Sequence, residues 1–212
     1  MIKIENLSFS YQGGKKLFDN ASFSLGDSDS LGLCGANGSG KSAFLQVTAG
    51  LLRPSSGRIE FFGKEMRLEK NYREIRSKIG YLFQDPDDQL FCPIVEEEIA
   101  FGLFNIGKKR DEIKKSIAEI LSELELGGYE KKYTSKLSGG EKRLVSLAAI
   151  LVMKPEILLL DEPSAGLDEK SKNIVARILN ASGSSKIIVS HDGDFLEKTV
   201  SSSLTLKDGK IG

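Results

Sequence analysis

Residues 35–42 form a glycine-rich loop that constrains this chain more than any other feature of its sequence. The run Gly-Ala-Asn-Gly-Ser-Gly-Lys-Ser matches the pattern G-x-x-x-x-G-K-[ST] at every fixed position. A short apolar run at residues 31–34 precedes the loop, and the composition turns helical from Ala43 onward. The order of strand, loop and helix is the start of a βαβ unit. The sequence therefore predicts a phosphate-binding loop.

The chemistry of such a loop requires these residue types at this spacing. Glycines let the backbone curl so that successive N–H groups point at phosphate oxygens, and the following helix presents its N-terminus to the same anion. Lys41 supplies a positive charge to the outer phosphates, and the Ser42 hydroxyl is placed to bind Mg²⁺. We therefore expect ATP and Mg²⁺ as cofactors. The expected contacts of the nucleotide in this loop are Gly35, Ala36, Asn37, Gly38, Ser39, Gly40, Lys41 and Ser42.

Two carboxylates, Asp161 and Glu162, follow a continuous apolar run at residues 157–160. Such a run is expected of a strand that is covered on both faces, and ligands of open α/β sheets bind outside the carboxyl ends of the strands. Asp161 suits the hydration shell of Mg²⁺, and Glu162 would face an attacking water as its general base. The alternative is an acidic N-cap of the next helix. The phosphate loop in the same chain favours the catalytic interpretation.

The rest of the chain alternates strand-like and helical stretches. Strand patterns cover residues 2–9, 17–25, 57–63, 79–83, 186–190 and 204–207. The first of these strands look antiparallel, whereas later strands alternate with helices, which implies an α/β core with a mainly parallel sheet. Residues 85–150 look almost wholly helical. We expect a single domain over residues 1–212, with an N-terminal antiparallel β subdomain and an inserted α-helical subdomain at about residues 85–150.

Composition limits the remaining possibilities. The 30 basic and 30 acidic residues give a formal net charge of +0, so the chain carries no electrostatic footprint for nucleic acid. No stretch approaches the roughly 20 apolar residues that span a bilayer, and residues 1–5 lack the apolar run of a signal peptide. Cys34 and Cys92 have no metal-like spacing. We therefore expect a soluble protein that stays in the cytosol.

The segment Leu137-Ser138-Gly139-Gly140-Glu141 resembles the signature motif of the ATP-binding-cassette (ABC) family, and the resemblance covers essentially the whole chain. The motif is a second glycine loop that opens a helix, with Ser138 as N-cap. The resemblance implies an ATPase with the ABC-type P-loop fold. It also implies a head-to-tail dimer, in which Ser138, Gly139, Gly140 and Glu141 contact the γ-phosphate held by the partner's Lys41. A homodimer and a heterodimer with a second ABC ATPase both remain open.

Other marks of the family follow in the expected order. Tyr11 resembles the aromatic residue that stacks on adenine, although an exposed turn tyrosine would look the same. Gln84 resembles the glutamine that senses Mg²⁺ and the transmembrane partner, and the alternative is a polar cap at a strand end. Asp168 ends a loop that resembles the link between the two sites of the dimer. His191, the one histidine of the sequence, resembles the switch histidine that contacts the γ-phosphate.

One position departs from the family pattern. A hydroxyl residue that reaches the α-phosphate usually follows the magnesium serine, and here that position is Ala43. The substitution removes one hydrogen bond, worth on the order of 1 kcal/mol. We therefore expect Ala43 to line the nucleotide site and the affinity for ATP to be somewhat weaker, without loss of activity. In sum, the resemblance implies Glu162, His191 and Gln84 as catalytic residues, and Ser42, Gln84 and Asp161 at the Mg²⁺ site.

Residues 84–91 resemble the corresponding stretch of energy-coupling-factor importers, which take up vitamins and transition-metal ions such as cobalt or nickel. The resemblance implies integral-membrane transporter subunits as partners and a peripheral location on the cytoplasmic face of the membrane. Phe91, Phe101, Leu103 and Phe104 would form the apolar floor of the groove that receives a membrane subunit, unless they pack inside the helical subdomain. The alternatives are an ABC importer or exporter of another type and a soluble ABC protein that works on DNA or ribosomes.

Overall fold

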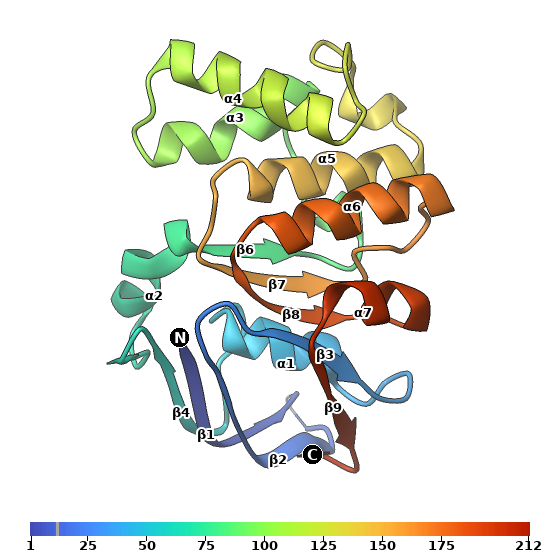
Figure 1. Ribbon diagram of the computed structural model, residues 1–212. Helices are drawn as coiled ribbons and strands as arrows, with labels where there is room; N and C mark the ends of the chain where they lie inside the picture. Colours follow the sequence, from blue (N-terminus) through green and yellow to red (C-terminus); the bar gives the residue numbers. More distant parts are fainter. Residues whose placement is uncertain (12) are drawn as a thin grey trace.

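The computed structural model describes residues 1–11 and 13–212 and shows an α/β molecule built in layers (Figure 1). A mainly parallel sheet lies in the middle, an antiparallel sheet lies below it in this view, and helices lie above it. The fold class predicted from the sequence is therefore confirmed. Over the described ranges, no helix has both the length and the apolar character needed to cross a bilayer.

The central sheet has the strand order β10-β9-β3-β8-β7-β6 among the residues that the structure describes. All neighbours pair in parallel except β10, which is antiparallel to β9. The carboxyl ends of the parallel strands therefore lie at one edge of the sheet, where ligands bind in open α/β folds. The strands are β3 (Ser30–Cys34), β6 (Ile79–Leu82), β7 (Ile157–Asp161), β8 (Ser185–Val189), β9 (Ser202–Lys207) and β10 (Lys210–Ile211).

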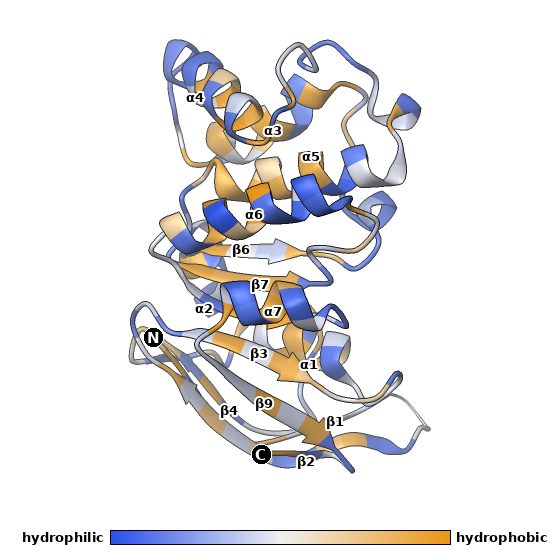
Figure 2. Ribbon diagram, turned by 45° about the vertical axis from the view of Figure 1, so that its right-hand side comes forward, coloured by the Kyte–Doolittle hydropathy of each residue, from blue (hydrophilic) through white to orange (hydrophobic). Residues whose placement is uncertain are grey.

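Strand β7 shows why residues 157–160 form an apolar run. Ile157 and Leu159 pack into the core shared with the antiparallel sheet, whereas Leu158 and Leu160 pack into the core beneath the helices. Because side chains of a strand alternate between its two faces, only a continuous apolar sequence fills both cores. Figure 2 shows the result as apolar colour along β7, between the helical layer and the lower sheet.

The N-terminal strands form the antiparallel sheet that the sequence predicts. Its order is β2-β1-β4-β5, with β1 (Ile2–Ser10), β2 (Lys16–Leu25), β4 (Ser56–Phe61) and β5 (Lys64–Glu65). Helix α1 (Lys41–Thr48) packs against this sheet, where the ring of Phe44 lies 5.4 Å from that of Phe18 and 5.6 Å from that of Phe23. Side chains of α1 and of both sheets share one core, which fixes the start of α1 relative to the strands.

The remaining helices lie mostly on the other face of the central sheet (Figure 1). They are α2 (Glu69–Ile75), α3 (Val95–Asn105), α4 (Arg110–Glu123), α5 (Gly139–Leu151), α6 (Glu169–Ala181) and α7 (Gly193–Thr199). The stretch expected to be helical, residues 85–150, contains α3, α4 and α5, but residues 106–109 and 124–133 between them are not helical. Sequence analysis did not predict α2 and α7, because helices of seven residues carry too little periodic pattern.

Gly57 provides a test of the contact between β4 and β1. Its φ is +98°, and a Cβ atom added there would lie 2.5 Å from both the Asn6 carbonyl oxygen and the Leu7 Cα. Both neighbours are backbone atoms that cannot turn away. We expect Gly57→Ala to lower the free energy of unfolding by roughly 2–4 kcal/mol, measured by urea denaturation followed by circular dichroism.

Gly63 is the matched control for this substitution. It also has a positive φ, +75°, but no atom lies within 4 Å of an added Cβ. Gly63→Ala should therefore cost only the left-handed backbone strain of about 1–2 kcal/mol. Equal losses for the two variants would show that the close approach of β4 to β1 does not matter for stability.

Candidate functional site

The phosphate loop lies between the end of β3 and the start of α1, as predicted. Gly40 is the N-cap of α1 and adopts a left-handed conformation with φ +102°, and no side chain caps the helix. The first N–H groups of α1 are therefore left to an anion. At Gly35, φ is +151°, and an added Cβ would lie 2.5 Å from the Leu206 carbonyl oxygen. Only glycine fits there without moving β9.

Lys41 folds over this loop. Its Nζ donates hydrogen bonds to the carbonyl oxygens of Gly35 and Ala36, at 2.8 and 3.0 Å. The side chain is buried, so its positive charge is held at the loop in a medium where electrostatic interactions are strong. Ala43, the third residue of α1, is buried in the core with Phe44. Its expected contact with the nucleotide stays a prediction.

A cavity of about 490 Å³ brings together the residues that the sequence predicts as Mg²⁺ ligands. Ser42, Gln84 and Asp161 all line it, together with Gln46. Asp161 is 2% exposed, and among the described residues its Oδ1 atom has no hydrogen-bond partner. Burial raises the pKa of Asp161, and the hydroxyl of Ser42 opposes this effect. A buried carboxylate oxygen without a partner, beside a hydroxyl and an amide, suits a hard cation such as Mg²⁺.

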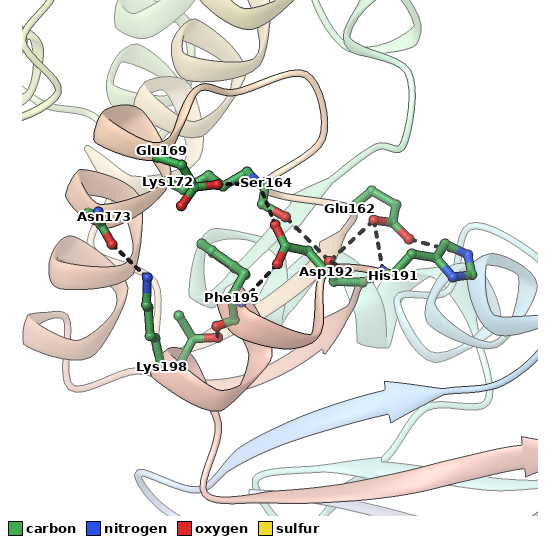
Figure 3. Close-up of polar contacts among 11 residues, drawn as sticks. Glu162, Ser164, Glu169, Lys172, Asn173, His191, Asp192, Phe195 and Lys198 are labelled. Atoms are coloured by element: carbon green, nitrogen blue, oxygen red, sulfur yellow. Dashed lines mark hydrogen bonds and ion pairs between the residues drawn. The ribbon is translucent and has the colours of Figure 1, made fainter.

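Glu162 directly follows Asp161, the last residue of β7, and is oriented by residues that follow β8 (Figure 3). Its Oε2 atom accepts hydrogen bonds from the backbone N–H of His191 at 3.2 Å and from the Ser190 hydroxyl at 3.3 Å. The Nε2 atom of His191 lies 3.7 Å from Glu162 Oε1. The backbone of Glu162 is left-handed, with φ +52°, which costs energy for a residue with a Cβ. The two predicted catalytic residues are thus adjacent.

The loop after Glu162 also contacts the segment that follows β8. The Ser164 hydroxyl lies 3.4 Å from the Ser190 hydroxyl, and both are buried. Asp168 caps α6 by accepting a hydrogen bond of 2.7 Å from the N–H of Ser171, and this bond lowers the pKa of Asp168. In one subunit Asp168 therefore acts as an N-cap. Its expected role across a dimer is not tested by a single chain.

The signature segment starts α5 as the sequence predicts. Ser138 is the N-cap and forms a capping box with Glu141, in which the Ser138 N–H donates to Glu141 Oε2 at 2.7 Å. A Cβ added at Gly140 would lie 3.0 Å from the carbonyl oxygen of Gly166, so the signature loop packs closely on the loop that follows Glu162. Among the residues described, no hydrogen bond or ion pair joins the signature segment to the phosphate loop.

Tyr11 follows β1 and is 53% exposed, with its ring 5.1 Å from that of Phe9 in an edge-to-face arrangement. Its exposed face is available for stacking. Sequence analysis did not single out Lys15 and Lys16, which line a cavity of about 540 Å³ beside the phosphate loop. Lys15 adds positive charge there, which favours an anionic ligand, whereas the charge of Lys16 is partly neutralised by Asp19 at 3.0 Å. The signal that could have revealed them is the pair of basic residues directly after the Gly13-Gly14 turn.

The predicted docking residues divide into two groups. Phe91, Phe101 and Phe104 are exposed, and the rings of Phe91 and Phe101 lie 4.7 Å apart, edge to face. For Leu103 the alternative holds, because this residue is buried in the core of the helical subdomain and not at a surface. On α3, Leu103 lies on the face of the helix that is turned towards the core, whereas Phe101 and Phe104 lie on the face that is turned outward. We name Phe91, Phe101 and Phe104 the aromatic patch.

Glu98 positions the loop that carries this aromatic patch. The carboxylate is buried and accepts hydrogen bonds from the backbone N–H groups of Phe91 and Cys92, at 2.9 and 2.7 Å. A charged acceptor that satisfies two buried donors is costly to remove. The exposure of Phe91, at 64%, is therefore built into the fold.

Comparisons with known proteins agree with this geometry. A profile of the family described as "ABC transporter" matches residues 18–165. The energy-coupling factor transporter ATP-binding protein EcfA of Methanothermobacter thermautotrophicus is 37% identical, over 100% of this chain and 69% of that protein. The structure of cbiO1 from Clostridium perfringens, part of the ABC transporter complex cbiONQ, has a TM-score of 0.85 and 34% identity, covering 100% of this chain and 86% of that one.

The chain also resembles a solved structure that contains bound nucleotide. It is the dimeric post-hydrolysis state of the ATP-binding cassette MJ0796 bound to ADP and Pi. The TM-score is 0.91 and the identity 25%, over 100% of this chain and 96% of that chain.

Glu141 gives the site a testable pH dependence. The Tyr129 hydroxyl, which donates at 2.5 Å, and then the Ser138 N–H lower the pKa of Glu141 to about 2, from an ordinary value of 4.5. A lowered pKa means that the carboxylate stabilises the fold above about pH 4.5 and that this stabilisation is lost as the pH falls towards 2. The difference in unfolding free energy between the natural protein and Glu141→Gln should therefore be constant near neutral pH and shrink below pH 4.5.

Urea denaturation at a series of pH values measures this difference. Tyr129→Phe removes the hydroxyl that contributes most to the lowered pKa, so in its background the effect of Glu141→Gln should depend less on pH. Parallel stability curves for the natural protein and Glu141→Gln down to about pH 2.5 would contradict the assignment.

Proposed function

Because the chain belongs to the ABC transporter family, as an ATP-binding and ATP-hydrolysing subunit, we propose that it powers an importer of the energy-coupling-factor type. The observation that carries this proposal is the aromatic patch, which is exposed and begins at Phe91, shortly after Gln84 in the chain. The similarity to EcfA and to cbiO1 supports the same subfamily. The transported solute would be a vitamin or a transition-metal ion.

Residues 1–212 would act as one nucleotide-binding domain, with residues 85–150 as its helical subdomain. The phosphate loop and the start of α1 bind the triphosphate, with Lys41 neutralising its charge and Tyr11 stacking on the base. Lys15 and Lys16 add positive charge beside the same loop. Residues 35–42 would therefore hold the phosphates, and hydrolysis depends on side chains that follow other strands.

Hydrolysis requires a general base, and Glu162 has the position for it. The bonds from Ser190 and His191 fix one of its oxygens, which leaves the other to accept a proton from water. His191 is exposed on the same side and would contact the γ-phosphate. Mg²⁺ bound by Ser42, Asp161 and Gln84 would neutralise charge on the phosphates.

Among the described residues, no hydrogen bond or ion pair joins the signature loop to the phosphate loop of its own chain. We therefore infer that Ser138, Gly139, Gly140 and Glu141 complete the site of a second subunit, with Asp168 near the join. The dimeric state of the similar MJ0796 cassette supports this arrangement. The partner would be a second copy of this chain or another ABC ATPase.

Closure of such a dimer would be transmitted to integral-membrane subunits at the cytoplasmic face of the membrane. The aromatic patch offers three exposed rings on one side of α3 and its preceding loop. Exposed apolar clusters of this kind mark sites of protein association. The similar cbiO1 protein is part of a complex, cbiONQ.

Two substitutions test the roles within the nucleotide site. Glu162→Gln should bind ATP normally and lower the rate of hydrolysis by roughly 10²–10⁴-fold, since it removes the base and keeps the shape. Lys41→Ala should lose ATP binding. Equilibrium binding of a fluorescent ATP analogue and release of inorganic phosphate measure the two effects, with Lys170→Met on the exposed face of α6 as control. Normal turnover by Glu162→Gln would refute the base.

The transport function is tested by isolating the chain from detergent-solubilised membranes of its own cell. Mass spectrometry should identify an integral-membrane coupling subunit and a substrate-binding membrane subunit beside it. Phe91→Ser should lower the recovery of both by at least tenfold without changing ATPase activity in solution. Leu68→Ser, which alters a similarly exposed residue before α2, is the control and should have no effect. Recovery of soluble or ribosomal proteins alone would overturn the transport proposal.

A further inference from the structure

Arg143 joins the signature helix α5 to the segment that carries Gln84. It lies two residues after Glu141, and its side chain is 3% exposed. Its Nη1 atom donates to the carbonyl oxygen of Phe83 at 2.6 Å, and its Nη2 atom donates to the carbonyl oxygen of Gln84. The guanidinium therefore holds two consecutive peptide groups where β6 ends.

Arg143 lies near the acidic residues of the nucleotide site. Burial lowers the pKa of Arg143, and the charges of Asp161, Asp85 and Glu162 oppose that effect. Its Nε atom is buried and has no hydrogen-bond partner in the described part of the chain. An arginine stays charged in proteins, so a buried guanidinium at this point brings its charge close to the carboxylates that hydrolysis uses.

Two weaker contacts join the same two elements. Lys142 forms an ion pair of 2.5 Å with Asp87, but Asp87 is largely exposed, and exposed pairs contribute little. Gln89 donates to the Ser146 carbonyl oxygen at 2.9 Å and accepts from the Phe83 N–H at 3.2 Å. Of these contacts, only that of Arg143 reaches the backbone of Gln84 itself.

We propose that Arg143 is a positioning residue for ATP hydrolysis, which fixes the backbone of Phe83 and Gln84 against α5 and so holds the Gln84 amide in the cavity with Ser42 and Asp161. The inference rests on the proposed role of Gln84. Because α5 begins at the signature loop, a displacement of that loop is passed through Arg143 to Gln84. The forked guanidinium suits this task, since a lysine ammonium would reach the two carbonyl groups less well.

A kinetic double-mutant cycle tests the proposal on the full chain. The four proteins are the natural one, Arg143→Lys, Gln84→Ala and the double variant. Arg143→Lys keeps the charge and loses the fork, so kcat should fall about tenfold while the Kd for ATP stays within about twofold. If Arg143 acts through Gln84, the double variant should be no slower than Gln84→Ala alone. Arg177→Lys, on the exposed face of α6, is the matched control and should keep the natural kcat.

Two further measurements keep the result interpretable. Hydrogen–deuterium exchange without nucleotide should increase at residues 83–90 in Arg143→Lys and stay unchanged at residues 35–42. Thermal unfolding identifies a variant that has lost its fold, and Arg143→Gln, which keeps one donor group, then replaces Arg143→Lys.

The outcomes distinguish a failure of the role proposed for Arg143 from a failure of the role proposed for Gln84. Multiplied losses in the double variant, about a hundredfold for two tenfold effects, would show that Arg143 acts independently of Gln84 and would overturn the inference. An unchanged kcat in Arg143→Lys would do the same. If Gln84→Ala alone kept the natural kcat, the proposed role of Gln84 would fail first, and the inference with it.

Discussion

The parallel pairing of β3, β8, β7 and β6 is the constraint on which the site depends. Its register sets Leu33 opposite Val189 and Val189 opposite Asp161. Because these strands end at nearly the same level, the segments that follow them meet at one edge of the sheet. The phosphate loop, Glu162 and His191 come from widely separated parts of the sequence, and the backbone hydrogen bonds between strands bring them together. Few direct contacts between these segments are then needed.

Acidic residues in this edge region show how local environment divides their tasks. Asp168 and Asp192 accept hydrogen bonds from backbone N–H groups at the starts of α6 and α7. The bond from Ser171 lowers the pKa of Asp168, and the contact with Lys172, followed by the Phe195 N–H, lowers the pKa of Asp192. Asp161 has no such partner for one oxygen, and burial raises its pKa. The caps stabilise the fold, whereas the buried and unpartnered oxygen of Asp161 costs stability. Local instability of this kind is expected at functional sites.

Much of this site could be predicted from the sequence, because its segments carry local patterns. The glycine loop at residues 35–42 and the apolar run before Asp161 each specify a short piece of backbone without reference to the rest of the chain. Sequence analysis left two alternatives open for Leu103, because an exposed apolar residue of a patch and a buried one beneath it look alike in sequence. Arg143 escaped attention because its partners are backbone carbonyl groups, which leave no trace in side-chain identity. The same holds for Glu98, whose partners are backbone N–H groups.

Helix α5 links the parts that the sheet alone does not connect. Its first turn carries the signature loop, and its next turn holds the Gln84 segment through Arg143. Its inner face packs with α3, which bears two rings of the aromatic patch. A rigid helix with contacts at both ends transmits a displacement with little loss, since its packed core resists deformation. The aromatic patch and the Gln84 segment are therefore both attached to α5, and under the proposed role of Arg143 a partner that shifts α3 would also change the position of Gln84.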